Sequence, residues 1–142
     1  MKKGTTYLYA TTEEFMAILA KGGFVPVKYK TCNTKGYQEY FINEDCDYIA
    51  IKSNKKNDLI KYTYFKYNPN TSKNNSGYHI INVGFSALLH RVMAYTFLGN
   101  PTDDQRDINH IDGNKDNCRP SNLEYCTHAY NMKEYHRMRK EK

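Results

Sequence analysis

Residues 107–131 read DINHIDGNKDNCRPSNLEYCTHAYN, and this stretch decides the local fold. Two short extended runs, 108–111 and 122–125, flank a loop. The loop opens at 112–114 with Asp-Gly-Asn, which is typical of tight turns because Gly and Asn tolerate positive φ angles. The threonine after the second run can cap a helix over about 128–139. The stretch therefore predicts strand, loop, strand and helix, with His and Asn side chains throughout.

The sequence before this stretch predicts an α+β fold class, with a small N-terminal antiparallel β-sheet and flanking helices. Thr11 and Glu14 form a capping-box pattern at the start of a helix that ends at Gly22-Gly23. Ser86 is the predicted cap of a second helix, which ends before Gly99. The predicted extended segments are 24–27 (an edge segment, because it contains Pro26), 37–42, 48–52, 60–67 and 78–85, and a polar loop covers 68–77.

The composition favours an anionic partner. The 142 residues carry a net charge of +6, the pI is about 9.0, and 14 residues are tyrosines. Lys and Arg neutralise phosphates and release counterions, so this balance fits a nucleic acid. A solvated basic surface without a partner fits the charge equally well. The length predicts one compact domain, or one core with a small appendage.

The sequence predicts a cytoplasmic protein without membrane association. It contains no apolar run of about 18 residues, so no transmembrane helix is expected. The basic start, Met1-Lys2-Lys3, is followed by Thr and Glu rather than by the apolar core of a signal peptide. The cysteines are widely spaced and form no C-x-x-C pair, which favours free thiols over a structural zinc site. They are Cys32, Cys46, Cys118 and Cys126.

The His and Asn side chains of 107–131 suit the hydrolysis of a phosphodiester. A neutral His can activate water, because its ordinary pKa of about 6.5 lies near the operating pH. Mg²⁺ can stabilise charge on the phosphate, and it prefers oxygen ligands. Asn oxygens are hard donors, though weaker than carboxylates. Taken alone, His110 in a strand is more often a structural histidine, and Asn131 can be a surface residue of a helix.

The same stretch resembles the HNH endonucleases, specifically the phage and intron-encoded homing branch of that family. The resemblance covers residues 77–132. It implies a ββα-metal fold over about 107–139, within a nuclease core at 77–142, and leaves 1–76 as an N-terminal α+β module. The matching residues are Gly77-Tyr78, Leu89-His90-Arg91-Val92, Ala94, Thr96, Phe97, Asn109 to Lys115, Asn117, Arg119-Pro120, Asn122-Leu123-Glu124 and Asn131.

The resemblance also implies a role for each signature residue. His110 would be the general base, and Asn122 would bond backbone groups and fix the loop between the strands. Asn109 and Asn131 would bind one Mg²⁺ or Mn²⁺ ion through their amide oxygens. Many HNH proteins have Asp at the position of Asn109, so this chain departs from the pattern. We therefore expect a lightly held metal ion.

The expected substrate is double-stranded DNA. One active site per chain predicts a monomer that nicks one strand and leaves 5′-phosphate and 3′-hydroxyl ends, whereas a double-strand cut requires a dimer or two encounters. We expect no helix-turn-helix module after the motif, and therefore modest sequence preference and salt-sensitive binding. The N-terminal sheet is a candidate second surface, through Lys61, Tyr62, Tyr64, Lys66 and Tyr67. The candidate contacts near the motif are His90, Arg91, Lys115, Arg119, Lys133 and Arg137.

Several alternatives remain open at this point. His90 can pack against the hairpin rather than contact phosphate, Asp112 is expected to form a turn rather than bind metal, and His128 is an alternative ligand to Asn131. A catalytically weakened DNA-binding or virion-associated protein is the alternative function, favoured by the neutral Asn109. A zinc module would need Cys118, Cys126 and His128 to converge, and their spacing is poor. The expected setting is a phage-infected bacterial cell.

Overall fold

The computed structural model describes residues 7–29, 39–56, 58–68, 73–74, 76–82 and 86–140. It shows an α+β fold, which confirms the predicted class. A five-stranded antiparallel sheet has the order β1-β5-β4-β3-β2, so the proline-containing segment lies at an edge as predicted. The strands are β1 (Leu8–Ala10), β2 (Val25–Pro26), β3 (Glu39–Ile42), β4 (Tyr48–Lys56) and β5 (Leu59–Phe65).

The sheet differs from the prediction in detail. Strand β1 was not predicted, because three residues are too few to show a period-two pattern. Strand β4 runs to Lys56 rather than to residue 52, and β5 ends at Phe65 rather than at 67. The predicted first residues of β3, at positions 37–38, lie outside the described residues, as do 69–72 and 75 of the predicted loop.

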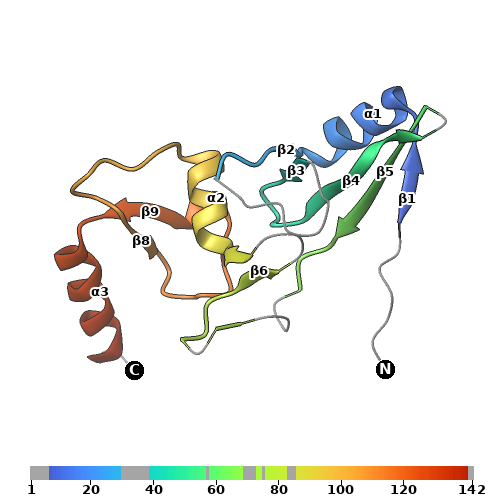
Figure 1. The fold of residues 1–142 in the computed structure, drawn as a ribbon. Coiled ribbons are helices and arrows are strands. Elements are labelled where there is room, and N and C mark those ends of the chain that lie inside the picture. Colours follow the sequence, from blue (N-terminus) through green and yellow to red (C-terminus); the bar gives the residue numbers. More distant parts are fainter. Residues whose placement is uncertain are drawn as a thin grey trace.

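Helix α1 (Thr12–Gly22) covers one face of this sheet (Figure 1). Both halves of the predicted capping box form: Thr11 N donates to Glu14 Oε1 at 2.9 Å, and Glu14 N donates to Thr11 Oγ1 at 3.1 Å. Gly23 ends the helix with φ of 68°, a left-handed conformation that favours glycine. The helix contributes Phe15 and Leu19 to a buried cluster with residues of the sheet. The prediction for this helix is confirmed.

The segment from residue 78 to the second helix corrects the sequence prediction. A single strand ending at a Ser86 helix cap was expected. Instead, β6 (Ile80–Asn82) and β7 (Ser86–Leu88) pair as a short antiparallel hairpin, and α2 (Leu89–Phe97) begins directly after β7. The hairpin ladder pairs Asn82 with Ser86, so the backbone of Ser86 is extended in a strand rather than placed at a helix terminus. Residues 83–85 lie outside the described part of the chain.

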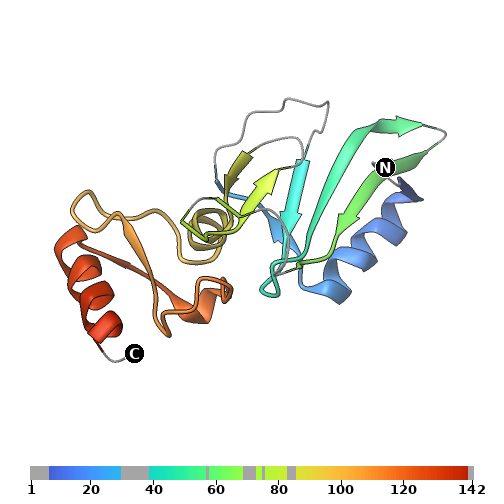
Figure 2. The same ribbon diagram turned by 90° about the horizontal axis from the view of Figure 1, so that it is seen from below.

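Helix α2 is the centre of the second core. Figure 2 shows it between the five-stranded sheet and the C-terminal elements. Val92 and Met93 are fully buried there, against sheet residues on the face opposite α1 and against the segment that follows α2. Cys118 and Cys126 are buried free thiols, as expected. One buried cluster thus joins residues on both sides of position 76, and the division into modules at that position stays a prediction.

The C-terminal elements follow the predicted order of strand, loop, strand and helix. Strand β8 (Asp107–His110) pairs antiparallel with β9 (Leu123–Cys126), preceded by the short helix η1 (Pro120–Asn122). Helix α3 (His128–Lys140) packs against β8 and forms the end of the molecule opposite α1 (Figure 1). Thr127 caps it as predicted, because its Oγ1 accepts from Tyr130 N at 3.0 Å. Within the described ranges, no helix is long and apolar enough to span a membrane.

Candidate active site

An open pocket of about 820 Å³ lies between β8, the loop after it, and α3. Three of the four signature residues line it: Asn109 and His110 at the end of β8, and Asn131 on α3. Lys115 of the loop and Tyr78 of the segment before β6 complete the same wall. The structure therefore brings together side chains that are up to 53 positions apart in the sequence, from Tyr78 to Asn131.

Asn122 lies behind the loop and is buried. Its Oδ1 accepts from Asp112 N at 3.0 Å, and its Nδ2 donates to Asn117 O and to Asp112 Oδ1, both at 2.9 Å. One amide thus holds the start and the end of the loop, which is the role that the resemblance implies. The Asp112 carboxylate also accepts from Asn114 N and from Asn117 Nδ2, so its oxygens serve the turn, as expected.

Gly113 allows α3 to approach this loop. Its φ is 76°, a conformation that L side chains rarely adopt. A Cβ at this position would lie 2.5 Å from Met138 Sδ on α3. The glycine therefore serves both the turn and the closeness of the helix that carries Asn131.

His110 is buried at the end of β8, 6% exposed. Its ring stacks on Tyr78 with centroids 5.8 Å apart, and it meets His90 edge-on at 5.1 Å. Its Nε2 lies 3.8 Å from Cys118 Sγ. Nδ1, the other ring nitrogen, is therefore the one available to accept a proton. Burial lowers the pKa of His110 to about 4. The negative charge of Asp112 opposes this lowering, whereas the positive charges of Lys115 and His79 add to it. The imidazole is therefore neutral at neutral pH and can accept a proton.

His90 is a candidate DNA contact whose side chain is enclosed by other rings. It is 7% exposed and packs against the rings of Tyr78 and His110, which favours packing over a contact with phosphate. Its Nδ1 is buried and has no hydrogen-bond partner among the described residues. This environment agrees with the alternative that His90 packs inside the protein rather than contacts phosphate. Burial lowers the pKa of His90 to about 3, because a buried charge is unfavourable.

This burial predicts an acid-sensitive fold. The pKa of His90 is below its unfolded value of about 6.5, so its contribution to stability is complete above about pH 6.5 and is lost as the pH falls toward 3. Replacing His90 by Phe removes this titration. Between pH 6.5 and 5, the variant should lose about 2 kcal/mol less unfolding free energy than the wild type. Urea denaturation at both pH values measures the difference.

The control for this experiment is His136→Phe, because His136 is an exposed residue of α3. It should leave the pH dependence of the unfolding free energy unchanged. Equal pH dependence in wild type and His90→Phe would contradict the assignment of a buried, neutral His90.

Asn109 and Asn131 each place their amide nitrogen against a carboxylate. Asn109 Nδ2 donates to Glu124 Oε1 at 2.8 Å, and Asn131 Nδ2 donates to Asp107 Oδ2 at 3.3 Å. The oxygen of each amide therefore points away from the carboxylate to which its nitrogen donates. Among the described residues, no three His, Cys, Asp or Glu side chains form a metal-binding cluster. Two amide oxygens at one pocket nevertheless fit a hard divalent cation that keeps several waters.

The side chain of His128 also contacts the Asp107 carboxylate. Its Nδ1 lies 2.7 Å from Asp107 Oδ2, at the start of α3. That nitrogen is therefore directed at a carboxylate, whereas Asn131 lines the pocket. The structure thus favours Asn131 over His128 as the ligand on α3.

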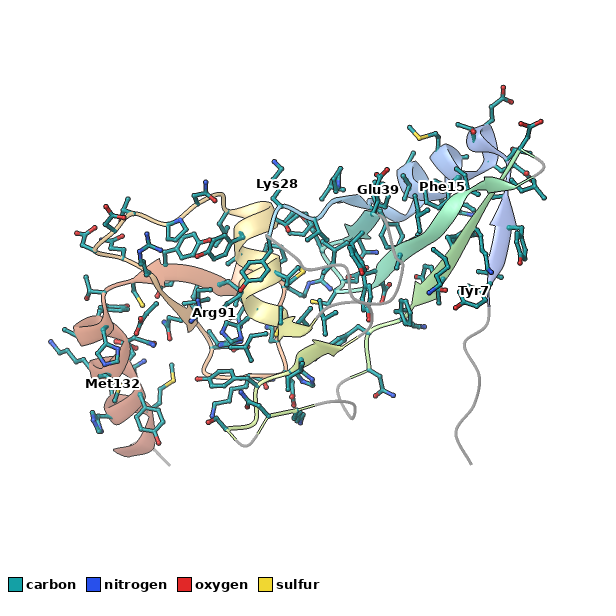
Figure 3. All side chains as sticks on the ribbon, viewed as in Figure 1. Tyr7, Phe15, Lys28, Glu39, Arg91 and Met132 are labelled. Atoms are coloured by element: carbon teal, nitrogen blue, oxygen red, sulfur yellow. The ribbon has the colours of Figure 1, made fainter. Side chains whose placement is uncertain are left out.

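The basic candidates fall into two groups. Lys115 lines the pocket, donates to Ser76 O at 2.7 Å, and lies 4.7 Å from the centre of the Tyr78 ring. Figure 3 shows Arg91 on α2 between the sheet, where Glu39 is labelled, and α3, where Met132 is labelled. Arg91 and Lys133 are exposed. Arg119 and Arg137 are instead paired with carboxylates, those of Asp45 at 2.5 Å and Glu134 at 2.9 Å.

The candidate surface on the N-terminal sheet is smaller than expected. Tyr62 is buried in the cluster under α1, and Tyr67 donates its hydroxyl to Asp116 O. Tyr64 and Lys66 remain exposed. A DNA contact here would therefore depend on few side chains.

Sequence reasoning missed Asp107 and Glu124 as parts of the site. Asp107 is two residues before Asn109 in a strand, so both side chains point to the same face of β8. Glu124 is the cross-strand partner of Asn109. A period-two reading of 107–110 could have found Asp107, whereas Glu124 requires the strand register.

Comparisons with known proteins agree with this geometry. Residues 87–133 match a family model described as HNH endonuclease. The chain is also 43% identical over 51 residues to an "Uncharacterized HNH endonuclease L245" of Acanthamoeba polyphaga mimivirus. That alignment covers 36% of this chain and 15% of the viral protein, so this chain spans only a small part of its relative's length. No solved structure matches the chain significantly.

Proposed function

We propose that the chain is a metal-dependent endonuclease that hydrolyses phosphodiester bonds of double-stranded DNA, because residues 87–133 match a family model described as HNH endonuclease. The observation that carries this proposal is the pocket in which a buried, neutral His110 meets the amides of Asn109 and Asn131. A base without a charge and two oxygen donors are the parts that hydrolysis of a phosphate ester requires.

His110 acts as the general base in this proposal. Its Nε2 is directed at the Cys118 sulfur, so Nδ1 takes the proton from the attacking water. The stack with Tyr78 and the edge-on contact with His90 fix the plane of the ring. Asn122 holds the loop that follows His110, and so keeps the pocket wall in place.

Asn109 and Asn131 would hold the divalent ion, for which we propose Mg²⁺ or Mn²⁺. When bound, such an ion supplies charge stabilisation to the phosphate and the leaving oxygen. With only two neutral ligands from the chain, the site binds metal weakly until a substrate phosphate adds further oxygens. Hydrolysis at the 3′ oxygen leaves 5′-phosphate and 3′-hydroxyl ends.

Lys115, Arg91 and Lys133 are the proposed phosphate contacts, because they are a pocket-lining lysine and two exposed basic residues on α2 and α3. Arg119 and Arg137 would have to exchange their present carboxylate partners for phosphates. Binding is therefore phosphate-dominated and weakens as salt rises. One pocket per chain acts on one strand, so the proposed product is a nick. The relative comes from a virus, which is consistent with a viral setting for this chain. Homing of a mobile element is the role that we propose there.

A plasmid assay tests the proposal. Supercoiled DNA incubated with the protein and Mg²⁺ or Mn²⁺ should become open circular, and EDTA should abolish the conversion. Linear product appearing before open circular product would indicate a dimer that cuts both strands. DNA binding without nicking, at any metal concentration, would contradict the nuclease and support the alternative of a weakened DNA-binding protein with a neutral residue at Asn109.

A further inference from the structure

We propose that Glu124 and Asp107 are positioning residues that turn the amide oxygens of Asn109 and Asn131 toward one divalent cation. The inference rests on the proposed function, since it concerns the metal site of that nuclease. Neither carboxylate is itself a ligand in this arrangement. Each acts through the amide that donates to it.

The Asn109–Glu124 pair is built into the strand register. The two residues lie directly opposite each other in β8 and β9, and the Asn109 Nδ2 to Glu124 Oε1 distance is 2.8 Å. A carboxylate at neutral pH only accepts hydrogen bonds, so the NH₂ end of the Asn109 amide must face Glu124. The oxygen end consequently faces away from Glu124. The orientation of the amide is thus decided by its partner.

The Asn131–Asp107 pair repeats this arrangement on the other side of the pocket. Asn131 Nδ2 donates to Asp107 Oδ2 at 3.3 Å, and the same oxygen lies 2.7 Å from His128 Nδ1. Asp107 therefore fixes two side chains of the first turn and a half of α3. Because Asp107 and Asn109 share one face of β8, both amides are oriented from the same strand pair.

These pairs offset the missing carboxylate ligand. A hydrogen bond from the amide NH₂ to a carboxylate polarises the amide and increases the electron density on its oxygen. It also removes the freedom of the amide to flip, which an isolated Asn would have to lose on binding metal. Outer partners of this kind typically contribute about 10- to 100-fold to metal affinity. Two neutral ligands can then hold a cation, with the negative charges of Glu124 and Asp107 on the far side of each amide.

The first test measures Mn²⁺ binding to the full chain by electron paramagnetic resonance, with an uncleavable phosphorothioate DNA duplex that supplies phosphate oxygens without turnover. Glu124→Gln and Asp107→Asn should each weaken Mn²⁺ affinity about 10- to 100-fold. Matched controls with the same chemical change are Glu13→Gln, in the first turn of α1, and Asp103→Asn, on an exposed loop. They should bind Mn²⁺ as the wild type does. Affinities of Glu124→Gln and Asp107→Asn equal to that of the wild type would overturn the proposal.

A second variant exchanges the two members of one pair. In Asn109→Asp with Glu124→Gln, the Gln donates its NH₂ to the new carboxylate, and the pair keeps its hydrogen bond with the roles reversed. Mn²⁺ affinity should return at least to the wild-type value. An affinity as low as that of Glu124→Gln alone would overturn the proposal. Circular dichroism and urea denaturation show whether each variant is folded. If Glu124→Gln alone does not fold, the Mn²⁺ affinity of the double variant still tests the proposal.

A third measurement separates positioning from direct ligation. In a Mg²⁺ titration followed by ¹³C NMR, the side-chain carbonyl of Asn109 should shift, and the carboxylate carbon of Glu124 should shift less. A larger shift at Glu124 would make it the ligand and overturn the inference while leaving the nuclease intact. If the wild type neither binds Mn²⁺ nor nicks DNA, the proposed function fails together with the inference.

Discussion

His110→Ala is expected to nick supercoiled DNA about 10²- to 10⁴-fold more slowly than the wild type, which is the usual contribution of a general base. The effect should be large because burial keeps His110 neutral and its Nε2 is directed at Cys118, so a single nitrogen is available for the water. The methyl side chain of alanine cannot accept a proton. Initial rates of open-circle formation at saturating Mg²⁺ measure the loss.

Two controls make this result specific. His136→Ala changes an exposed histidine of the same C-terminal segment and should nick at the wild-type rate. DNA affinity of His110→Ala, measured by fluorescence anisotropy in Ca²⁺, should stay within a few-fold of the wild type, because the basic residues are unchanged. Wild-type nicking by His110→Ala would show that another residue is the base.

The C-terminal elements were predictable because their signals are local. The Asp112-Gly113-Asn114 turn, the capping Thr127 and the spacing of the two extended runs each depend on a few neighbouring residues. The structure has the same order, with β8, β9 and α3 at nearly the predicted bounds. Ser86 shows the opposite case. Its cap signal is also local, but pairing of β7 with β6 placed it in a strand.

The burial of a side chain and the register between two strands could not be predicted from the sequence. His90 carries a basic ring next to Arg91, and its enclosure by the rings of Tyr78 and His110 becomes apparent only in the structure. Likewise, Glu124 is an ordinary polar residue of a strand until the register places it opposite Asn109. The sequence thus predicted that Asn109, His110 and Asn131 would lie at one site, whereas the partners of the two amides follow from tertiary structure.

The second large effect is expected for Asn122→Ala, which removes the side chain that holds both ends of the loop. Asp112 N and Asn117 O lose their partner, and such unsatisfied groups cost roughly 1–3 kcal/mol each. We expect about 3 kcal/mol less unfolding free energy, measured in urea at pH 7.5. Nicking should also fall about 100-fold or more, because a displacement of about 1 Å in a catalytic group is enough for such a loss.

Asn114→Ala separates a general loss of loop structure from the specific role of Asn122. Asn114 is exposed in the same loop, and its Oδ1 accepts only the local bond from Asp116 N. This variant should lose less than about 1 kcal/mol of unfolding free energy and keep its nicking rate within a few-fold of the wild type.

A more informative change is Asn122→Asp. It keeps the acceptor for Asp112 N, but it replaces the donor by a carboxylate oxygen that faces Asp112 Oδ1 and Asn117 O. Because two like charges then meet in a buried position, Asn122→Asp should be at least as inactive as Asn122→Ala. Near-normal nicking by Asn122→Asp would mean that only the acceptor matters, and that the end of the loop at Asn117 does not need to be held for catalysis.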